Sequence, residues 1–264
     1  MVRNSRTLGV LAVSLAALGS AYAQTPPAGS AQSPPARSAP PAANAVDPQS
    51  VQALKDMGAH LQSLRRFRVS TDHSGERVLA DGQKLTHMAT ADMDVERPGK
   101  VRVVMKNARS TRDLIYDGKT VTLYTPAQKY YSTVEFTGTL GELVSRLKER
   151  YNVELPLSDL FVWGTPAAPL NDIESAMNAG QDFVGDDLCD HYVFRQGKLD
   201  WQLWITADGK PLPRKLVITN RADEARPQSV SMIDWNLKPT FKNSVFEFVP
   251  PKGAKKIEIV QRKS

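Results

Sequence analysis

The sequence predicts a mostly β (α+β) fold, in which one large, curved antiparallel sheet of about eleven strands is covered by a few helices. Apolar and polar residues alternate with a period of two over much of the chain after Phe67, and turn signals separate the runs. Helical periodicity occurs ahead of the first strand and in one central block. No long alternation of strand and helix follows, which disfavours a doubly wound α/β fold.

The first predicted element is an amphipathic helix. Asp47 followed by Pro48 has the pattern of an N-cap with proline at the first helical position. Apolar residues then recur at steps of three and four, at Val51, Leu54, Met57, Leu61 and Leu64. Residues with this spacing lie on one face of a helix, so we expect that face to be buried.

Antiparallel strands are predicted over residues 67–135. Apolar and polar residues alternate in 85–95, with His87 and Met88 as the exceptions. Turn signals stand at Asp81-Gly82, Pro98-Gly99 and Asp117-Gly118. An Asp-Gly pair between two β-rich runs is a strong hairpin signal. These strands are therefore expected to form a meander.

A helical block interrupts the strands. Thr139 and Glu142 have the spacing of a capping box, and the helix that follows carries an apolar stripe. A short helix is predicted over 156–164, which begins with proline, ends with glycine and is apolar on nearly every side. Such a helix is buried on most sides or covers an apolar surface. A third helix is predicted over 171–179, ending at Gly180.

The period of two then returns. Strands are predicted at residues 183–184, 189–195, 199–206, 214–220, 229–237 and 245–249. In residues 199–206, the side chains of Leu199, Trp201, Leu203 and Ile205 fall on one face.

The N-terminus predicts export. Arg3 and Arg6 precede an uncharged run over residues 8–18, and residues 21–23 read Ala-Tyr-Ala. This is the pattern of a signal peptide over residues 1–23, cleaved after Ala23. The apolar run is about half of the roughly 20 residues that a membrane span needs, so we expect a soluble mature protein rather than one with a retained anchor.

Residues 24–46 are predicted to be a disordered linker. They consist largely of proline, alanine, serine, glycine and glutamine, and large apolar side chains are nearly absent. Such a segment cannot bury enough apolar surface to offset the entropy of ordering. Residues 47–264 are then expected to form one domain.

The charge pattern bears on possible partners. The formal net charge is +6, and removing Arg3 and Arg6 with the signal leaves about +4. Lysines and arginines are scattered through the domain rather than massed on one element. For an exported protein, nucleic acid is not expected as a partner, whereas a transient contact with a membrane surface remains open.

No residue pattern in the chain demands catalysis. Cys189 and His191 are the parts of a thiol nucleophile and its base, but two strand rises separate them by about 6.6 Å, beyond hydrogen-bond reach. A small buried cysteine on a core strand is the more common case. The four histidines lack the spacing of metal ligands. We therefore expect no enzyme, no metal and no cofactor.

Three stretches carry a resemblance to a known family: residues 116–126 with the pattern D-G-K-x-x-x-x-Y-x-P, residues 151–166, and residues 246–254 with the pattern F-x-F-x-P-P-x-G-A. The chain resembles an uncharacterised predicted periplasmic protein family, a domain of unknown function in the LolA/LolB-like superfamily of lipoprotein carriers. The resemblance implies an open half-barrel of antiparallel strands, closed by helices around an apolar cavity for acyl chains. Relatives with this fold carry lipoproteins or lipids, or sense envelope stress.

Apolar residues of the short helix and the late strands are predicted to line that cavity: Leu160, Phe161, Trp163, Trp201, Leu203 and Trp235. Ordinary core packing is the alternative for each. The expected function is that of a soluble periplasmic carrier or binding protein for a lipid, an acyl chain or a lipoprotein. The alternative is an envelope interaction or stress-sensing module without a small ligand.

Overall fold

The computed structural model of the chain describes residues 45–151, 153 and 155–259. The predicted signal peptide and nearly all of the predicted linker lie outside the described residues. The elements of the first half are α1 (Pro48–Ser63), β1 (Arg66–Val78), β2 (Lys84–Glu96), β3 (Lys100–Asn107), β4 (Thr111–Tyr116), β5 (Thr120–Thr125), β6 (Tyr130–Glu135) and α2 (Leu140–Tyr151). Those of the second half are the 3₁₀ helix η1 (Ser158–Phe161), β7 (Ser175–Val184), β8 (Asp187–Gln196), β9 (Leu199–Thr206), β10 (Pro213–Asn220), β11 (Gln228–Asn236), the 3₁₀ helix η2 (Asn243–Phe246) and β12 (Lys255–Lys256).

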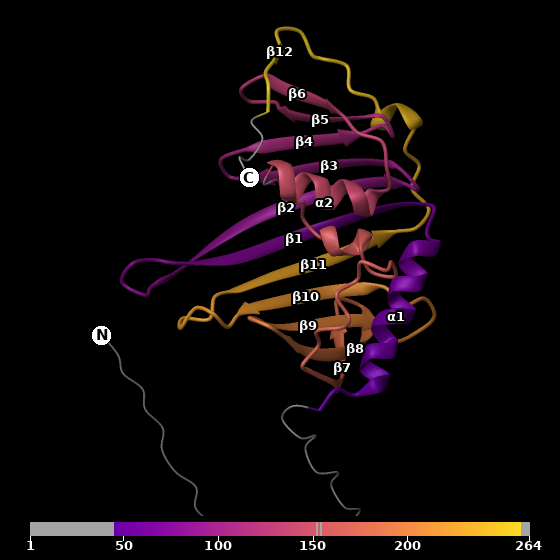
Figure 1. Cartoon of the computed structure of the whole chain (residues 1–264), viewed down its shortest axis with the longest axis vertical. Coiled ribbons are helices and arrows are strands. Elements are labelled where there is room, and N and C mark those ends of the chain that lie inside the picture. Colours follow the sequence, from indigo (N-terminus) through magenta and orange to yellow (C-terminus); the bar gives the residue numbers. More distant parts are fainter. Residues whose placement is uncertain (1–44, 152, 154, 260–264) are drawn as a thin grey trace, which may run out of the picture. The chain divides into compact units, whose positions relative to one another are not determined.

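The twelve strands of the described residues form a single sheet in the order β12-β6-β5-β4-β3-β2-β1-β11-β10-β9-β8-β7 (Figure 1). Neighbouring strands are antiparallel, except that β12 runs parallel to β6. The pairing of β1 with β11 joins an early meander, β1–β6, to a late one, β7–β11. β12 and β7 lie at opposite ends of the order, so the sheet is open. This confirms the predicted fold class.

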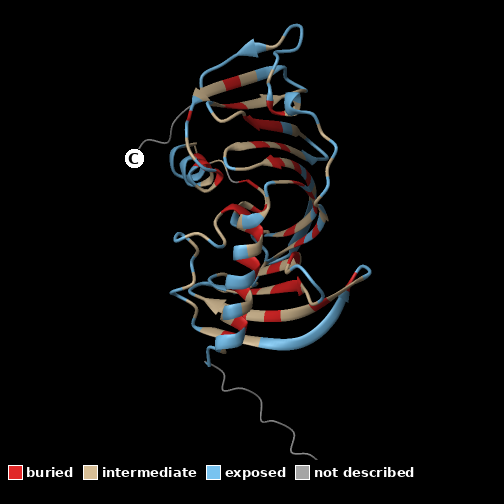
Figure 2. Cartoon of the chain, turned by 90° about the vertical axis from the view of Figure 1, so that its right-hand side faces the viewer, coloured by how far each residue is buried: buried red, intermediate tan, exposed pale blue. Residues whose placement is uncertain are grey.

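The sheet is curved, and α1, η1 and α2 lie on its concave side (Figure 2). The main core lies between these helices and the sheet. Leu54, Met57 and Leu61 of α1, Leu143 of α2 and Phe161 of η1 are all buried in it. None of the helices in the described residues is long and apolar enough to cross a membrane.

The structure confirms the predicted starts of α1 and α2, whereas the short helix predicted over 156–164 is the 3₁₀ helix η1 and begins only at Ser158. The Asp47 carboxylate accepts hydrogen bonds from the backbone N–H groups of Gln49 and Ser50, at 3.1 and 3.0 Å. These bonds satisfy donors that have no partner within the first turn of α1. In α2, the Thr139 N–H donates to Glu142 Oε2 at 2.7 Å and the Glu142 N–H donates to Thr139 Oγ1 at 3.3 Å, which forms the capping box.

The chain is already paired before α1 begins. Val46 forms a parallel bridge with Ala176, and the Ala176 N–H donates to the carbonyl of Ala45 at 3.1 Å. The sequence assigned Ala45 and Val46 to the linker. These two residues instead pair with the edge strand β7.

Two predicted elements are wrong. Residues 171–179 do not form a helix, because the chain from Ser175 onward is β7, paired with β8 over its length. Pairing with a neighbouring strand overrides the helical tendency of this alanine-containing stretch. Gly180, predicted to end the helix, lies instead at a register shift of β7, with φ of +106°.

Residues 245–249 do not form a strand either. The first two belong to η2, which places Phe246 in a buried position, 1% exposed and edge-on to Phe241. Phe248 packs against the rings of Tyr124 and Tyr131. The two aromatic residues are therefore held by side-chain packing rather than by a strand ladder.

Candidate ligand cavity on the concave face

The segment of residues 155–164, which contains η1, crosses the concave face of the sheet. Leu155, Leu157, Leu160 and Phe161 in this segment are buried. Two side chains from other elements hold its backbone. Arg97 Nη2 donates to the carbonyl of Leu160 at 3.4 Å, and Gln62 Nε2 of α1 donates to the carbonyl of Trp163 at 2.6 Å. The segment is thereby bound both to the turn that follows β2 and to α1.

An apolar cavity of about 170 Å³ lies between this segment, α1 and strands β9 to β11. Trp163 and Trp201 both line it, and their rings are in tilted contact, with centroids 5.8 Å apart. Trp201 is fixed from its other side, because it stacks on Phe194 at 4.1 Å. The cavity is lined by Met57, Leu157, Asp159, Leu160, Trp163, Pro169, Gln196, Leu199, Trp201, Leu203, Pro213, Leu216, Ile218 and Ile233.

Four of the six residues predicted for the cavity meet there: Leu160, Trp163, Trp201 and Leu203. The structure places the other two elsewhere. Phe161 is buried, and it borders a separate pocket beside α2. Trp235 packs against Phe67 at 5.5 Å, and its Nε1–H donates to the carbonyl of Pro213 at 2.8 Å. Trp204, also on β9, faces the opposite side of the sheet, where it stacks on His191.

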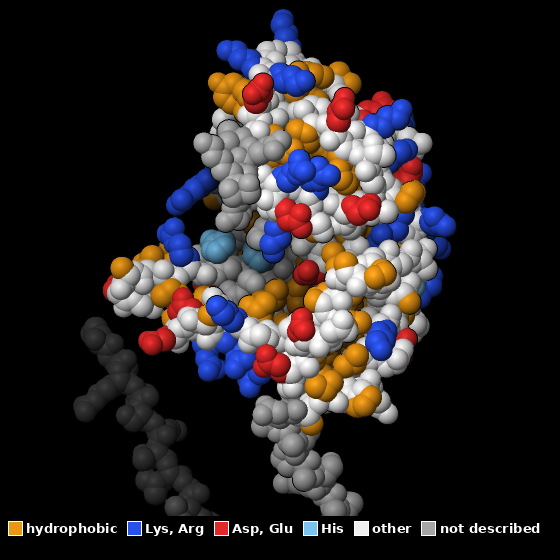
Figure 3. Space-filling view, viewed as in Figure 1, with side chains coloured by type: hydrophobic (Ala, Val, Ile, Leu, Met, Phe, Trp, Pro, Cys, Tyr) orange, Lys and Arg blue, Asp and Glu red, His pale blue; other side chains and the backbone are white. Residues whose placement is uncertain are grey.

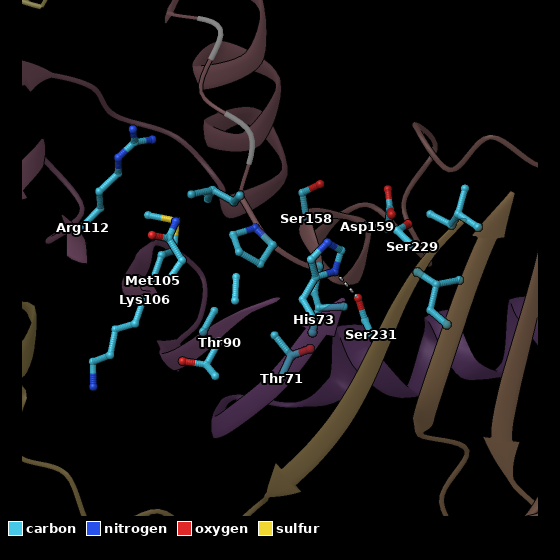
Figure 4. Close-up of a pocket in the computed structure, with 18 of the residues that line it drawn as sticks. Thr71, His73, Thr90, Met105, Lys106, Arg112, Ser158, Asp159, Ser229 and Ser231 are labelled. Carbon is cyan, nitrogen blue, oxygen red and sulfur yellow. Dashed lines mark hydrogen bonds between the residues drawn. The ribbon is translucent and has the colours of Figure 1, made fainter. Parts of the chain in front are cut away.

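A second pocket, of about 450 Å³, adjoins the apolar cavity. Leu157, Asp159, Leu216 and Ile218 line both. Its other walls are mostly polar, and Figure 4 shows the side chains of Thr71, Thr90, Lys106, Arg112, Ser158, Ser229 and Ser231 with His73 among them. In the space-filling view this face is hollowed, with histidine and hydrophobic side chains inside the hollow and lysine or arginine near its rim (Figure 3).

Strand register explains why these polar residues meet. His73 of β1 lies opposite Ser231 of β11 and opposite Ala89 of β2. A ring nitrogen of His73, Nδ1, is 3.1 Å from Ser231 Oγ. Sequence reasoning missed this pocket. The available signal was that Thr71 and His73 continue the face of β1 that Phe67 and Val69 begin with apolar side chains.

The pocket favours the neutral form of His73. Burial lowers the pKa of His73, and the neighbouring imidazole of His87, with ring centroids 6.4 Å apart, lowers the pKa further. Burial also lowers the pKa of His60 on α1, with a smaller contribution from Lys210. Both imidazoles therefore take up a proton less readily in the folded protein than in the unfolded chain.

We expect the free energy of unfolding to fall between pH 7.5 and pH 5.5. Near and below the ordinary histidine pKa of about 6.5, the unfolded chain binds more protons than the folded one. The stability that the neutral forms of His60 and His73 contribute is therefore fully present above that pH and is lost as the pH falls. Urea unfolding at several pH values measures this slope. The double variant His60→Gln, His73→Gln should show a shallower slope, while the wild-type slope above pH 7.5 serves as the control. An unchanged slope in the variant would contradict the assignment.

Cys189 and His191 lie on the convex side, away from both pockets. The Cys189 thiol is fully buried, and burial raises its pKa, with the nearby carboxylate of Asp187 raising it further. The ring of His191 is engaged by Trp204, at 4.0 Å, and by Gln202 Oε1, 2.9 Å from Nε2. Cys189 is thus placed as a core residue. Within the described residues, no group of three or more histidine, cysteine, aspartate or glutamate side chains is arranged to hold a metal ion.

An open antiparallel sheet, with helices and a cavity on its concave side, defines the structural class of this chain. The model of a family described as "Predicted periplasmic protein (DUF2092)" matches residues 50–260. The chain belongs to this family, as its sequence predicted. The family description confirms the predicted periplasmic location.

The solved structures to which the chain is similar are distant in sequence. An uncharacterised conserved protein from Thermus thermophilus shares 12% identity with a TM-score of 0.47, over 80% of this chain and 99% of that one. The Mycobacterium tuberculosis lipoprotein LppX shares 12% identity with a TM-score of 0.47, over 74% and 98%. A LolA superfamily protein from Nitrosomonas europaea shares 10% identity with a TM-score of 0.37, over 75% and 98%. No curated protein matches the chain.

Proposed function

We propose that this protein is a soluble carrier or binding protein of the periplasm, which takes the acyl chain of a lipid or lipoprotein into the cavity on its concave face. The observation that carries the proposal is the apolar cavity beside the Trp163–Trp201 pair, which the surrounding core leaves unfilled. Transfer of an acyl chain from water into such a cavity gains about 0.8 kcal/mol for each buried CH₂ group. A few methylene groups are therefore enough for useful affinity.

The size of the two pockets bears on the ligand. The apolar cavity alone, at about 170 Å³, is smaller than the ~300–1,000 Å³ of typical small-molecule sites. The adjoining polar pocket, at about 450 Å³, falls within that range. Since Leu157 and Leu216 line both, a ligand longer than the apolar cavity continues into the polar pocket.

Trp163 is the side chain best placed to distinguish binding from plain core packing. It is only partly buried and lies on the segment that covers the cavity, whereas Trp201 belongs to the sheet beneath. A fluorescent fatty-acid probe should bind the wild-type protein. We expect the Trp163→Ala variant to bind it at least about tenfold more weakly, since a contact worth 1.4 kcal/mol changes affinity by that factor.

Trp204→Ala is the matched control for this experiment. Trp204 is as large as Trp163 but lies on the convex face of β9, so its removal should leave probe affinity unchanged in folded protein. Native far-UV circular dichroism establishes that each variant is folded. If the wild-type protein binds no apolar probe, the carrier proposal fails and the interaction module without a small ligand takes its place.

A further inference from the structure

We infer that the ligand is an amphipathic lipid with an anionic head group, which lies in the polar pocket near Arg112 while its acyl chain passes beneath Leu157 toward Trp201. This inference rests on the proposed function and adds the chemical class of the ligand. It is carried by three separate features of the concave face, taken over the described residues: its polarity gradient, an arginine without an ion-pair partner and one buried hydroxyl group.

The polarity of the concave face changes along the strand order. Residues that lie opposite one another on consecutive strands form rows that run across the sheet. One such row contains Asn107, Ala89, His73, Ser231, Leu216 and Leu203, on β3, β2, β1, β11, β10 and β9. The row is mainly polar as far as Ser231 on β11 and apolar from Leu216 on β10 onward. A ligand that lies along it meets polar groups at one end and apolar groups at the other.

The polar end carries a cation, Arg112. Arg112 of β4 lies opposite Met105 of β3, and both line the pocket. Within the described residues, Arg112 forms no ion pair and no side-chain hydrogen bond. Lys106 lies on the neighbouring row, which ends at Trp204 on β9, so its side chain belongs to the convex face. Figure 4 shows Arg112 at one side of the pocket and Asp159 at the other, beside the border with the apolar cavity. This separation places the Arg112 guanidinium group where the head group of a bound lipid would lie.

Thr71 supplies a buried hydroxyl group without a partner. Its side chain is 3% exposed and lines the polar pocket, and its Oγ1 has no hydrogen-bond partner in the described residues. Buried polar side-chain atoms nearly always have a partner in native proteins. A hydroxyl group on the wall of a pocket is available to a polar atom of the ligand, such as a glycerol or ester oxygen.

The test compares two lipids that differ only in the head group: 1-oleoyl-lysophosphatidic acid and 1-oleoylglycerol. The wild-type protein should bind the phosphate-bearing lipid at least about tenfold more tightly, and this preference should decline with added salt because exposed charges are screened. In the variant Arg112→Gln, the preference should disappear while affinity for 1-oleoylglycerol stays the same. Arg109→Gln, an exposed cation near the β3–β4 turn that does not line the pocket, is the matched control and should retain the preference.

Thr71→Val provides a second readout, since it removes the hydroxyl group and preserves the shape of the side chain. We expect affinity for lysophosphatidic acid to fall several-fold while the melting temperature is unchanged or higher. A lower melting temperature with unchanged affinity would show that the hydroxyl group serves the fold rather than the ligand, and would overturn its assignment to the ligand.

The possible outcomes separate this inference from the proposal on which it rests. If neither lipid binds, the proposed function fails. If both bind equally and Arg112→Gln changes nothing, the carrier function stands and the anionic head group is wrong. If glycerol 3-phosphate alone binds as tightly as lysophosphatidic acid, the acyl chain adds nothing and the pocket is a small-anion site, which also overturns the inference.

Discussion

Replacement of Phe161 by alanine is expected to lower the free energy of unfolding by about 3–5 kcal/mol. The side chain is 2% exposed and belongs to the main core, and the guanidinium group of Arg97 lies 5.8 Å from its ring centroid. Alanine would leave a void beneath η1. The segment cannot move in to fill it, because Arg97 and Gln62 hold its backbone. Burial lowers the pKa of Arg97, so its surroundings already disfavour the charge. Urea unfolding followed by far-UV circular dichroism measures the loss.

Phe183→Ala is the control for this variant. It makes the same chemical change at a residue of β7 that is 74% exposed, so its effect on unfolding should be within about 0.5 kcal/mol. The sequence predicted that Phe161 lines the ligand cavity. Weaker probe binding by Phe161→Ala, with stability unchanged, would restore that prediction and contradict the core assignment.

Trp163 lines the predicted cavity and Phe161 does not, and this difference shows what could and could not be predicted from the sequence. Both were predicted from the apolar character of residues 156–164. Leu160 and Trp163, in the turn that follows η1, are three positions apart and both line the cavity, whereas Phe161 lies on another side of the segment. Composition alone could not separate them, because it does not tell which side of the segment faces the cavity.

Local patterns predicted most of the fold. The N-cap at Asp47, the capping box at Thr139 and the hairpin at Asp117-Gly118 each depend on a few neighbouring residues, and each is present. The failures at 171–179 and 245–249 are of another kind. There, pairing with β8 or the burial of Phe246 decides the conformation, and neither is encoded within the segment itself.

The polar pocket could not be predicted because it depends on a distant pairing. His73 and Ser231 are 158 residues apart and meet only because β1 pairs with β11. A period of two indicates which residues share a face of one strand, but it does not give the order of strands. Trp201 and Leu203 were predicted to share a face of one strand, and they do line the same cavity.

Replacement of Gly58 by alanine is expected to destabilise the protein by about 1–3 kcal/mol, although alanine favours a helix over glycine by about 1 kcal/mol. Gly58 lies on the buried face of α1, where a Cβ atom would stand 2.5 Å from the backbone nitrogen of Gly164 and 2.8 Å from its Cα. Gly164 has a φ of +77°, and the carbonyl of the preceding Trp163 accepts a hydrogen bond from Gln62. Backbone on both sides of the contact has to move to admit a methyl group.

The same substitution should weaken ligand binding, because displacement of Gly164 moves the adjoining Trp163 away from Trp201. Urea unfolding, probe affinity and tryptophan fluorescence should therefore change together. Ala59→Gly on the exposed side of α1 is the control: it should cost about 1 kcal/mol through helix propensity and leave probe affinity as in the wild type. If Gly58→Ala instead stabilises the protein, as glycine-to-alanine changes do at an ordinary helix position, then α1 does not position Trp163 and Gly164 through this contact.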